Sequence, residues 1–456
     1  MLLKNGLIYD EESGEAKKGD LRIEGEKIKE IASSLVEKEN EEVHDVSEKY
    51  VFPGIIDSHV HFQLESRGTV SDDDFYQGSV SAAYGGVTTF IDYADMNNDS
   101  LITGIEDRIK KAKHKTILDY NLHLVINNDF KIDKHLKEIE KLPEKGISSL
   151  KLFTTYKDIY MLAEEKMKKI FEKAADLDLV VTVHSEDNEI IEKRQEKYKE
   201  ENKTDFKYHP DIRPAEAEKE AIKKLSKYAK ESGAKLYIVH LSSKKGYEET
   251  LKARDKGVDI KVETTPHYLL LTRDLLEGEE ARYNFMTPPL RERKDNQALW
   301  KGLKNNNIDV VATDHCAFSK SKKEKGNDSF DTYPGIAGVE TLFPLLYTYG
   351  YDKGKISLKQ LIESTSINPA KIFGLYPQKG SLKEGSDADI LVYDPKKERR
   401  LKAAELHSNS EHTAYQGMEI KGDTYLNILR GNILIKDGDL RVRKDYGKFI
   451  KARIED

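Results

Sequence analysis

The stretch Phe52-Pro53-Gly54-Ile55-Ile56-Asp57-Ser58-His59-Val60-His61 decides how the rest of this 456-residue chain is interpreted. An apolar run suited to a buried strand ends in two histidines that are separated by one residue. Side chains at positions i and i+2 of a strand point to the same face, so His59 and His61 aim two imidazoles at one point. Two converging imidazoles are what a metal site requires, and the remaining sequence shows whether further ligands join them.

Apolar, β-branched-rich runs recur through the middle of the chain and alternate with helical segments or long loops. The runs are Ile55–His61, Val87–Asp92, Tyr120–Ile126, Ser148–Phe153, Leu179–His184, Lys235–Leu241, Val258–Thr264 and Ile308–Asp314. Connectors such as Asp73–Tyr84 and Pro214–Ser232 carry apolar residues at helical spacing. Alternating strands and helices predict a parallel sheet, and eight such units over roughly 300 residues predict a (β/α)8 barrel.

The two ends of the chain have a different pattern, with short period-two segments interrupted by turn residues. These segments are Leu2–Tyr9, Gly19–Ile28, Asp387–Tyr393 and Tyr425–Gly438. The Asn5-Gly6 and Glu24-Gly25 pairs inside the first two are typical of small hairpins. We therefore predict an α/β protein in which residues 53–377 form the barrel and residues 1–52 and 378–456 together form a small β-sandwich domain.

Composition and charge exclude several classes of partner. The chain has 75 basic and 82 acidic residues and a net charge of −7, a mild excess that argues against nucleic acid or an acidic membrane surface. Its one cysteine, Cys316, excludes an intrachain disulfide and fits a reducing compartment. The N-terminus lacks the apolar core of a signal peptide, and no apolar run approaches the roughly 20 residues that span a bilayer. We expect a cytoplasmic protein.

Metal-ligating residue types gather at the predicted strand ends, where barrels of this class carry their chemistry. They are His59, His61, Lys151, His184, His240 and Asp314. A core histidine, a lysine that reaches for solvent or a helix-capping aspartate would each be ordinary alone. Their coincidence across five strand ends disfavours a purely structural explanation and predicts a metal centre at one rim of the barrel.

Lys151 is the unusual member of this set, because a buried ammonium beside imidazoles and a dication would be costly. The cost disappears if the amine is deprotonated and has reacted with carbon dioxide to form a carbamate, whose two oxygens can bridge two metals. Six ligands are too many for one tetrahedral zinc but suit a pair. We predict that His59, His61 and Asp314 hold one metal, that His184 and His240 hold the other, and that carboxylated Lys151 lies between them.

The chain resembles the cyclic amidohydrolases of the amidohydrolase superfamily, in particular the hydantoinase/dihydropyrimidinase branch. The segment Lys151-Leu152-Phe153-Thr154-Thr155-Tyr156-Lys157 looks like the carboxylated-lysine strand of that branch followed by its substrate tyrosine. Further similar segments, spread over nearly the whole chain, are Gly85–Asp92, Asn368–Pro377, Gly385–Ile390 and Leu429–Asn432. The resemblance implies two divalent metal ions, expected to be Zn²⁺, and a homo-oligomer, either a tetramer or a dimer.

The same resemblance implies a reaction and its residues. A metal-bridging hydroxide would open a hydantoin or dihydropyrimidine ring to an N-carbamoyl amino acid. Asp314 would carry the proton from the hydroxide to the leaving nitrogen, and Tyr156 would stabilise the oxyanion. Backbone groups near Thr287 would hold the substrate imide, and Gln63 would contact the substrate.

Three other readings remain open from the sequence. Dihydroorotases place an arginine just after the His-x-His pair, where this chain has Gln63, and a neutral amide cannot form that bidentate ion pair. Allantoinases or dihydroorotases are favoured by the segments Glu263–Tyr268 and Gly335–Glu340, whereas Tyr156 favours the hydantoinase type. Non-catalytic scaffolds of the same fold typically lack the metal ligands, all of which are present here. The roles of His267 and of Cys316, for which a buried structural thiol is expected, are not determined by the sequence.

Overall fold

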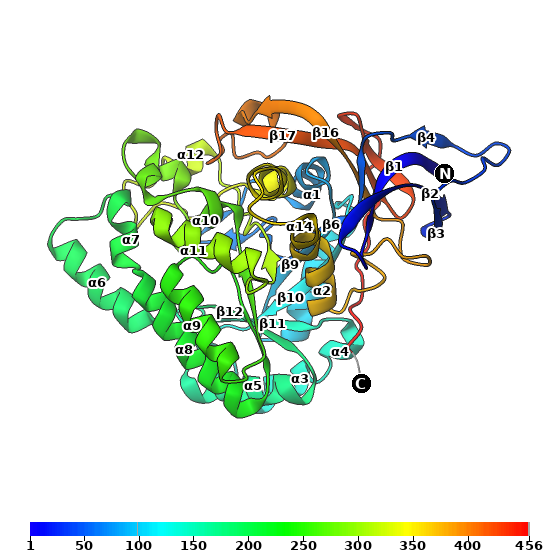
Figure 1. The fold of residues 1–456 in the computed structure, drawn as a ribbon. Helices are drawn as coiled ribbons and strands as arrows, with labels where there is room; N and C mark the ends of the chain where they lie inside the picture. Colours follow the sequence, from blue (N-terminus) through cyan, green and yellow to red (C-terminus); the bar gives the residue numbers. More distant parts are fainter. Residues whose placement is uncertain (98, 455–456) are drawn as a thin grey trace.

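The computed structural model describes residues 1–97 and 99–454, and Figure 1 shows a barrel beside a sheet made from both ends of the chain. The barrel sheet has eight strands in the order β15-β14-β13-β12-β11-β10-β9-β6, and all of its ladders are parallel. The strands are β6 (Ile55–Asp57), β9 (Val87–Asp95), β10 (Asp119–Val125), β11 (Ser149–Phe153), β12 (Val180–His184), β13 (Lys235–Ile238), β14 (Ile260–Thr264) and β15 (Val310–Val311). The predicted barrel is confirmed.

Side chains rather than a strand ladder complete the circle between β15 and β6. The buried carboxylate of Asp57 accepts hydrogen bonds from the backbone N–H of Thr313 at 3.1 Å and from its hydroxyl at 2.5 Å. Beyond the two strands, Val60 and His315 form an isolated parallel bridge. These contacts draw the end of the first strand and the end of the last strand together, and the candidate site lies at this junction.

Helices cover the outside of the barrel, and their sequences explain where they begin and end. In α8 (Ala215–Ser232) the buried residues recur at helical spacing, acidic residues occupy the first turn, and Gly233 ends the helix at a φ of 80°. The N-cap Asp74 of α1 (Phe75–Tyr84) accepts hydrogen bonds from two backbone N–H groups. The other large barrel helices are α2 (Leu101–Ala112), α3 (Ile132–Ile139), α5 (Glu164–Asp176), α6 (Asn188–Glu200), α9 (Lys244–Asp255) and α11 (Arg293–Lys304).

Shorter helices follow the loops and the C-terminal part of the barrel. They are α4 (Leu142–Lys145), α7 (His209–Ile212), α10 (Pro266–Leu270), α12 (Lys320–Lys323), α13 (Leu342–Leu346), α14 (Leu358–Ile362) and α15 (Asn368–Ile372). None of the helices in the described part of the chain combines the length and the apolar character that crossing a bilayer demands.

The second sheet joins the N-terminal strands to the C-terminal strands. Its path is β19-β18-β17-β16-β5-β1-β2-β3, with β4 paired to β1, and the antiparallel β5–β16 ladder joins the two ends of the chain. The strands are β1 (Leu2–Asp10), β2 (Glu15–Glu24), β3 (Lys27–Ala32), β4 (Val43–Asp45), β5 (Tyr50–Pro53), β16 (Ile390–Arg400), β17 (Glu419–Leu429), β18 (Asn432–Lys436) and β19 (Asp439–Leu440). The expected β-rich unit from both termini is therefore one mixed sheet.

One predicted hairpin is wrong. Asn5-Gly6 does not turn the chain, because β1 runs through it from Leu2 to Asp10. Instead the register with β2 shifts between Leu3 and Gly6, which is a bulge, and Asn5 takes a φ of 63° while its N–H donates to Asp20 Oδ1 at 2.8 Å. The turns between β2 and β3 and between β17 and β18 fall where the sequence predicts hairpins.

The last part of the chain leaves the sheet and returns to the barrel. The N–H of Ile450 donates to the carbonyl of Tyr120 at 2.8 Å, and the N–H of Ala452 donates to the carbonyl of Gly146 at 3.0 Å. The end of the expected sandwich segment thus packs on the N-terminal side of β10. The division of the chain at residues 52/53 and 377/378 stays a prediction.

Candidate active site

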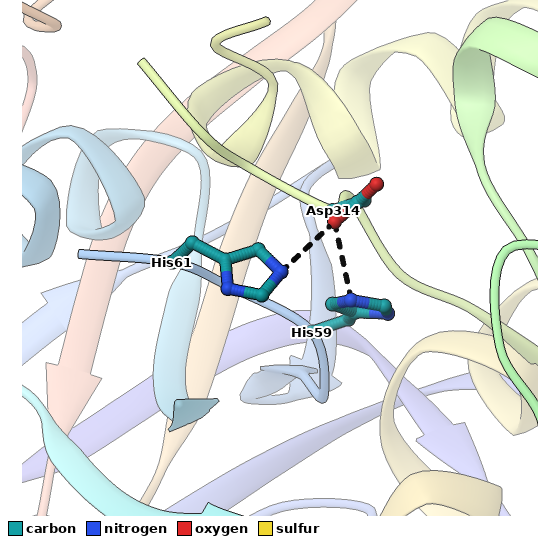
Figure 2. Close-up of side chains that lie close together, drawn as sticks. All are labelled: His59, His61 and Asp314. Atoms are coloured by element: carbon teal, nitrogen blue, oxygen red, sulfur yellow. Dashed lines mark ion pairs between the residues drawn. The ribbon is translucent and has the colours of Figure 1, made fainter. Parts of the chain in front are cut away.

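Three of the predicted metal ligands meet just beyond β6 and β15 (Figure 2). The Nε2 atoms of His59 and His61 lie 3.1 and 3.2 Å from Oδ1 of Asp314. One ligand atom from each of the three residues lies within 4.8 Å of the others, which is the spacing of a metal site. The side chain of His59 is buried, whereas those of His61 and Asp314 are 18% and 15% exposed. One side of this group therefore faces a cavity.

The strand that was expected to carry His59 and His61 is shorter than predicted. Regular pairing in β6 ends at Asp57, so both histidines lie in the following loop. Single hydrogen bonds then hold this loop: the N–H of Val60 donates to the carbonyl of Ile91 at 3.3 Å, and the N–H of His61 donates to that of His315 at 2.8 Å. The two imidazoles still converge, because these bonds keep the chain extended after the ladder has ended.

Glu263, at the end of β14, orients His59. Its carboxylate lies 2.7 Å from Nδ1 of His59, and it also accepts hydrogen bonds from the Tyr237 hydroxyl at 2.9 Å and from the His240 N–H at 3.0 Å. A carboxylate can only accept, so Nδ1 of His59 carries a proton, and Nε2 is the ring nitrogen that could face a metal ion. This role of Glu263 is not among the sequence-based predictions, although a charged residue inside the predicted buried strand Val258–Thr264 could have indicated it.

His184 and His240 form a second pair. Nδ1 of His184 lies 3.0 Å from Nε2 of His240, and both side chains are buried. Nε2 of His184 donates to Glu186 at 2.8 Å, which leaves the lone pair of Nδ1 directed at His240. Arg213 in turn donates from Nε to the same carboxylate at 3.0 Å. Burial lowers the pKa of both imidazoles, so they are neutral and able to bind a metal.

Lys151 is buried on β11 without a carboxylate partner. Only 2% of its surface is exposed, and within the described ranges no acidic oxygen lies within 4.0 Å of its Nζ. The nearest aromatic rings, those of Tyr93 and Phe153, have centroids 5.1 and 5.2 Å away. Burial lowers the pKa of Lys151 to about 8, against the opposing effect of Asp314 and Glu263. About a tenth of such an amine is neutral at pH 7, and the neutral form is the one that reacts with carbon dioxide.

Three residues that follow the barrel strands and line this region have left-handed backbone conformations. The φ angles of Tyr156, His240 and Asp314 are 65°, 39° and 51°. A non-glycine residue in this region costs of order 1–3 kcal/mol, and such residues concentrate where the surrounding structure must place a side chain in one position. Here the three residues end or follow three different barrel strands and direct their side chains toward one cavity.

A cavity of about 440 Å³ unites the predicted residues. Its wall includes all six predicted ligands, His59, His61, Lys151, His184, His240 and Asp314, together with Tyr156 and Thr287. Burial raises the pKa of Tyr156, against the opposing charge of Arg213, so its hydroxyl remains a hydrogen-bond donor at neutral pH. Thr287 lies beside His209, with 3.3 Å between its Oγ1 and the histidine Nε2.

Gln63 does not line this cavity. Its side-chain oxygen accepts a hydrogen bond from Lys115 Nζ at 3.2 Å, and its backbone N–H donates to Asp73 at 2.7 Å. The backbone of Gln63 has a φ of 47°. The expected contact between Gln63 and a substrate stays a prediction, and the proposed site is built from the residues that line the cavity.

The sequence left the roles of Cys316 and His267 undetermined, and of these two residues only Cys316 lines the cavity. Cys316 is buried, lines the cavity, and has a thiol whose pKa is raised by burial, as expected of an unreactive structural cysteine. His267 lies outside the lining. Burial lowers its pKa to about 4, and neither of its ring nitrogens has a hydrogen-bond partner in the described structure.

The donors of this region fit divalent metal ions. Nε2 of His59 is buried and has no hydrogen-bond partner among the described residues, although a carboxylate is adjacent. Burial opposes protonation of His59, yet Glu263 and Asp314 raise its pKa to about 9, which shows that the site favours a positive charge. Converging imidazole lone pairs, a carboxylate and an unpaired amine form the mixed nitrogen and oxygen set that zinc-like ions accept.

Comparison with known proteins agrees with this geometry. Residues 50–434 match the Amidohydrolase family. A D-hydantoinase of Geobacillus stearothermophilus is 35% identical over 457 residues, covering 99% of this chain and 96% of that protein. The crystal structure of dihydropyrimidinase from Brevibacillus agri superposes with a TM-score of 0.96 at 33% identity, covering 99% of this chain and 98% of that one. A D-hydantoinase (dihydropyrimidinase) from Thermus sp. gives a TM-score of 0.95 at 33% identity, with 99% of both chains covered.

Proposed function

The chain belongs to the amidohydrolase family as a cyclic amidohydrolase of the hydantoinase/dihydropyrimidinase type, and from this premise we propose that it opens hydantoin or dihydropyrimidine rings to N-carbamoyl amino acids. The observation that carries the proposal is the shared cavity wall of His59, His61, Lys151, His184, His240 and Asp314. A non-catalytic scaffold would not need buried, strained donors directed into a cavity.

We assign the metal-binding side chains to two ions according to which of them lie close together. His59, His61 and Asp314 would hold one ion, His184 and His240 would hold another, and carboxylated Lys151 would complete both. When bound, two divalent ions, for which Zn²⁺ is our choice, would supply an activated water near neutral pH and polarise the amide carbonyl. Glu263 and Glu186 support this centre by fixing the protonated nitrogens of His59 and His184.

The residues of the chain supply the proton transfer and the orientation. The oxygen of water joins the carbonyl carbon, the ring carbon–nitrogen bond breaks, and the products are a carboxylate and a free ureido group. Asp314 accepts a proton from the attacking water and delivers it to the leaving nitrogen. The hydroxyl of Tyr156 donates to the carbonyl oxygen as negative charge develops on it. Backbone groups near Thr287 hold the imide.

A hydrolysis panel on the metal-loaded protein tests the proposal. The compounds are hydantoin, 5-substituted hydantoins, dihydrouracil, allantoin and dihydroorotate, and the measurement is formation of the ring-opened ureido product. We expect the hydantoins or dihydrouracil to be opened fastest. Preference for allantoin would reassign the chain to that reaction, and a protein that binds no metal and opens none of the rings would be a scaffold. Light scattering on the same sample measures the homo-oligomeric state that belongs to this proposal.

Asp314→Asn provides the matched test of the proton-transfer role. We expect turnover to fall by at least about a hundredfold, because general acid–base groups contribute effects of this size or more. Asp255→Asn, the same change at an exposed residue of α9 outside the cavity wall, is the control and should keep wild-type turnover. Near-native turnover in Asp314→Asn would remove the proton transfer from this residue.

A further inference from the structure

A two-stranded hairpin at the rim of the cavity carries an arginine that the reaction does not use. The hairpin consists of β7 (Glu65–Ser66) and β8 (Thr69–Val70), and Arg67 and Gly68 form its two-residue turn. Arg67 belongs to the cavity wall, as do Tyr156 and Asp314. A positive charge therefore lies at the open side of the same cavity whose floor holds the candidate metal centre.

The charge of Arg67 has no internal counterpart. Within residues 1–97 and 99–454, no carboxylate oxygen lies within 4.0 Å of its guanidinium, and the side chain makes one hydrogen bond, from Nη1 to the carbonyl of Thr332 at 3.4 Å. That bond links the hairpin tip to the segment preceding Tyr333, which also lines the cavity. The guanidinium therefore keeps most of its five donors available to a ligand.

Three carboxylates belong to the cavity wall. Glu65 pairs with Lys111, and Asp314 lies against His59 and His61. Asp95 is exposed at the end of β9. In the described residues none of the three comes within 4.0 Å of the Arg67 guanidinium, so a negative charge in direct contact with Arg67 comes from the molecule that enters.

The turn itself does not require an arginine. The φ angles of Arg67 and Gly68 are 48° and 77°, the left-handed pair that Asn-Gly adopts with least strain. A bulky residue at the first position is conformationally unfavourable. The arginine is thus held in a costly conformation at the rim of the cavity, where its side chain can act.

Apolar side chains form a large part of the cavity wall to which the exposed Arg67 belongs. They include Leu64, Phe153, Ile159, Phe318 and Tyr333. An ion pair formed against apolar groups is weakened less by water than one in open solvent. A short hydrocarbon stem that ends in a carboxylate matches this combination, because the stem contacts the apolar groups and the carboxylate meets the planar guanidinium through two parallel hydrogen bonds.

We propose that the substrate of this chain is a cyclic ureide with a carboxylate on its ring substituent, and that Arg67 binds this carboxylate while the ring lies at the candidate metal centre. The inference rests on the proposed function and narrows it to an anionic substrate class. Arg67 is a specificity-determining residue in this arrangement, and it takes no part in bond making or breaking.

The test compares an anionic substrate with its neutral counterpart on the metal-loaded, full-length protein. The first pair is hydantoin-5-acetic acid and hydantoin-5-acetamide, which differ in charge at nearly constant shape. The second pair is hydantoin-5-propionic acid and hydantoin-5-propionamide, in which the stem is one methylene longer. We expect the acid of at least one pair to be favoured over its neutral partner by about tenfold or more in kcat/KM. The favoured pair shows how long the stem is.

Substitution of Arg67 then tests whether this residue causes the preference for the acid. In Arg67→Gln the acid-to-neutral ratio of kcat/KM should fall by about ten- to a hundredfold, mainly through the KM of the acid, because the contact is made equally in the ground state and the transition state. Arg67→Lys should retain part of the ratio, since the charge remains but the planar fork is lost. Arg443→Gln removes an exposed arginine outside the cavity wall and should keep the wild-type ratio.

The outcomes separate this inference from the proposed function. Hydrolysis of the neutral rings with no preference for either acid, or a ratio that Arg67→Gln leaves unchanged, would overturn the role of Arg67 and leave the cyclic amidohydrolase intact. Failure of the metal-loaded wild type to open any of the four rings would overturn the proposed function and the substrate class with it.

Discussion

Two compact groups of metal-ligand residue types in this chain are alike in their spacing and differ in how their charges are balanced. Both place acidic or imidazole ligand atoms within 4.8 Å of one another, at His59, His61 and Asp314 and at Asp119, Asp387 and Asp389. In the second group Lys379 lies among the three carboxylates, with Nζ–O distances of 2.5, 3.0 and 2.8 Å. In the first group the nearby Lys151 has no such partner in the described structure.

The pKa values of the two lysines express this difference. Burial alone would lower the pKa of Lys379, but the three carboxylates outweigh it and raise the pKa above its usual value. Burial of Lys151 is opposed only by more distant carboxylates, and its pKa falls to about 8. Arg430 also pairs with Asp119, and Lys27 with Asp387, so three cations balance the three carboxylates of this cluster, which joins the barrel to the terminal sheet. A cluster that leaves donors and an amine unsatisfied is suited to ions and a substrate from outside.

The largest expected effect on stability comes from Lys379→Met. The change leaves three buried carboxylates facing one another, and removing one partner of a buried ion pair typically costs about 3–5 kcal/mol. Urea denaturation followed by circular dichroism measures the loss. Lys383→Met, at an exposed position of the same segment, is the control and should change the free energy of unfolding little. A loss below about 1 kcal/mol would contradict the structural role assigned to this cluster.

Lys151→Ala should keep the protein folded but abolish metal binding at the proposed centre. Loss of the bridging group should lower turnover by more than about a hundredfold, which exceeds the effect typical of residues that only support a ligand. Metal analysis by mass spectrometry and turnover of the same sample measure it, with the exposed Lys145→Ala as the matched control. Full activity with two bound metals per chain would rule out the carbamate bridge.

A smaller effect is expected from Glu263→Gln, which tests how His59 is oriented. The amide is nearly isosteric but no longer stabilises the proton on Nδ1 of His59 as a carboxylate does. Metal affinity should fall by about 10- to 100-fold, as for other supporting partners of metal-bound histidines. Competition with a chelator measures the affinity. Glu279→Gln, at a surface position distant in sequence, provides the comparison, and equal affinities of the two variants would exclude the orienting role.

The smallest effect comes from a third buried lysine, Lys323, whose Nζ donates to the carbonyl of Phe285 at 3.0 Å. Burial lowers its pKa from 10.5 to about 7. Between these values the unfolded chain binds a proton that the folded chain has released, so stability should rise with pH through this window, by up to about 1.4 kcal/mol per pH unit. Below pH 7 both states are protonated and this gain is absent.

Urea denaturation at pH 7.5 and pH 8.5 measures the contribution of Lys323. The difference between the two pH values should be about 1 kcal/mol smaller in Lys323→Met than in the exposed control Lys325→Met. Identical pH dependence in the two variants would show that Lys323 keeps an ordinary pKa. The comparison of Lys379, Lys151 and Lys323, in which the pKa of a buried lysine follows the number of carboxylates beside it, would then fail for Lys323.

Much of the fold and of the candidate site could be predicted because the signals are local. Continuous apolar runs such as Val180–His184 mark strands that are buried on both faces, and their ends place His184 and Asp314 at one rim. The failures occur where a partner distant in sequence decides the outcome. β6 ends at Asp57 before the two histidines, and Asn5-Gly6 forms a bulge because β2 pairs along it.

The sequence by itself determined the alternation of strands and helices, the pairing of the two termini in one β-rich unit and the residue types of the candidate centre, because hydrophobic period and strand order depend on near neighbours. Only the tertiary structure decided which charges are balanced. It brought three carboxylates to Lys379, left Lys151 without a partner, placed Glu263 behind His59 and directed Arg67 into the cavity. Charge balance in a folded protein depends on distances between residues far apart in the chain, and these distances exist only after the barrel has closed.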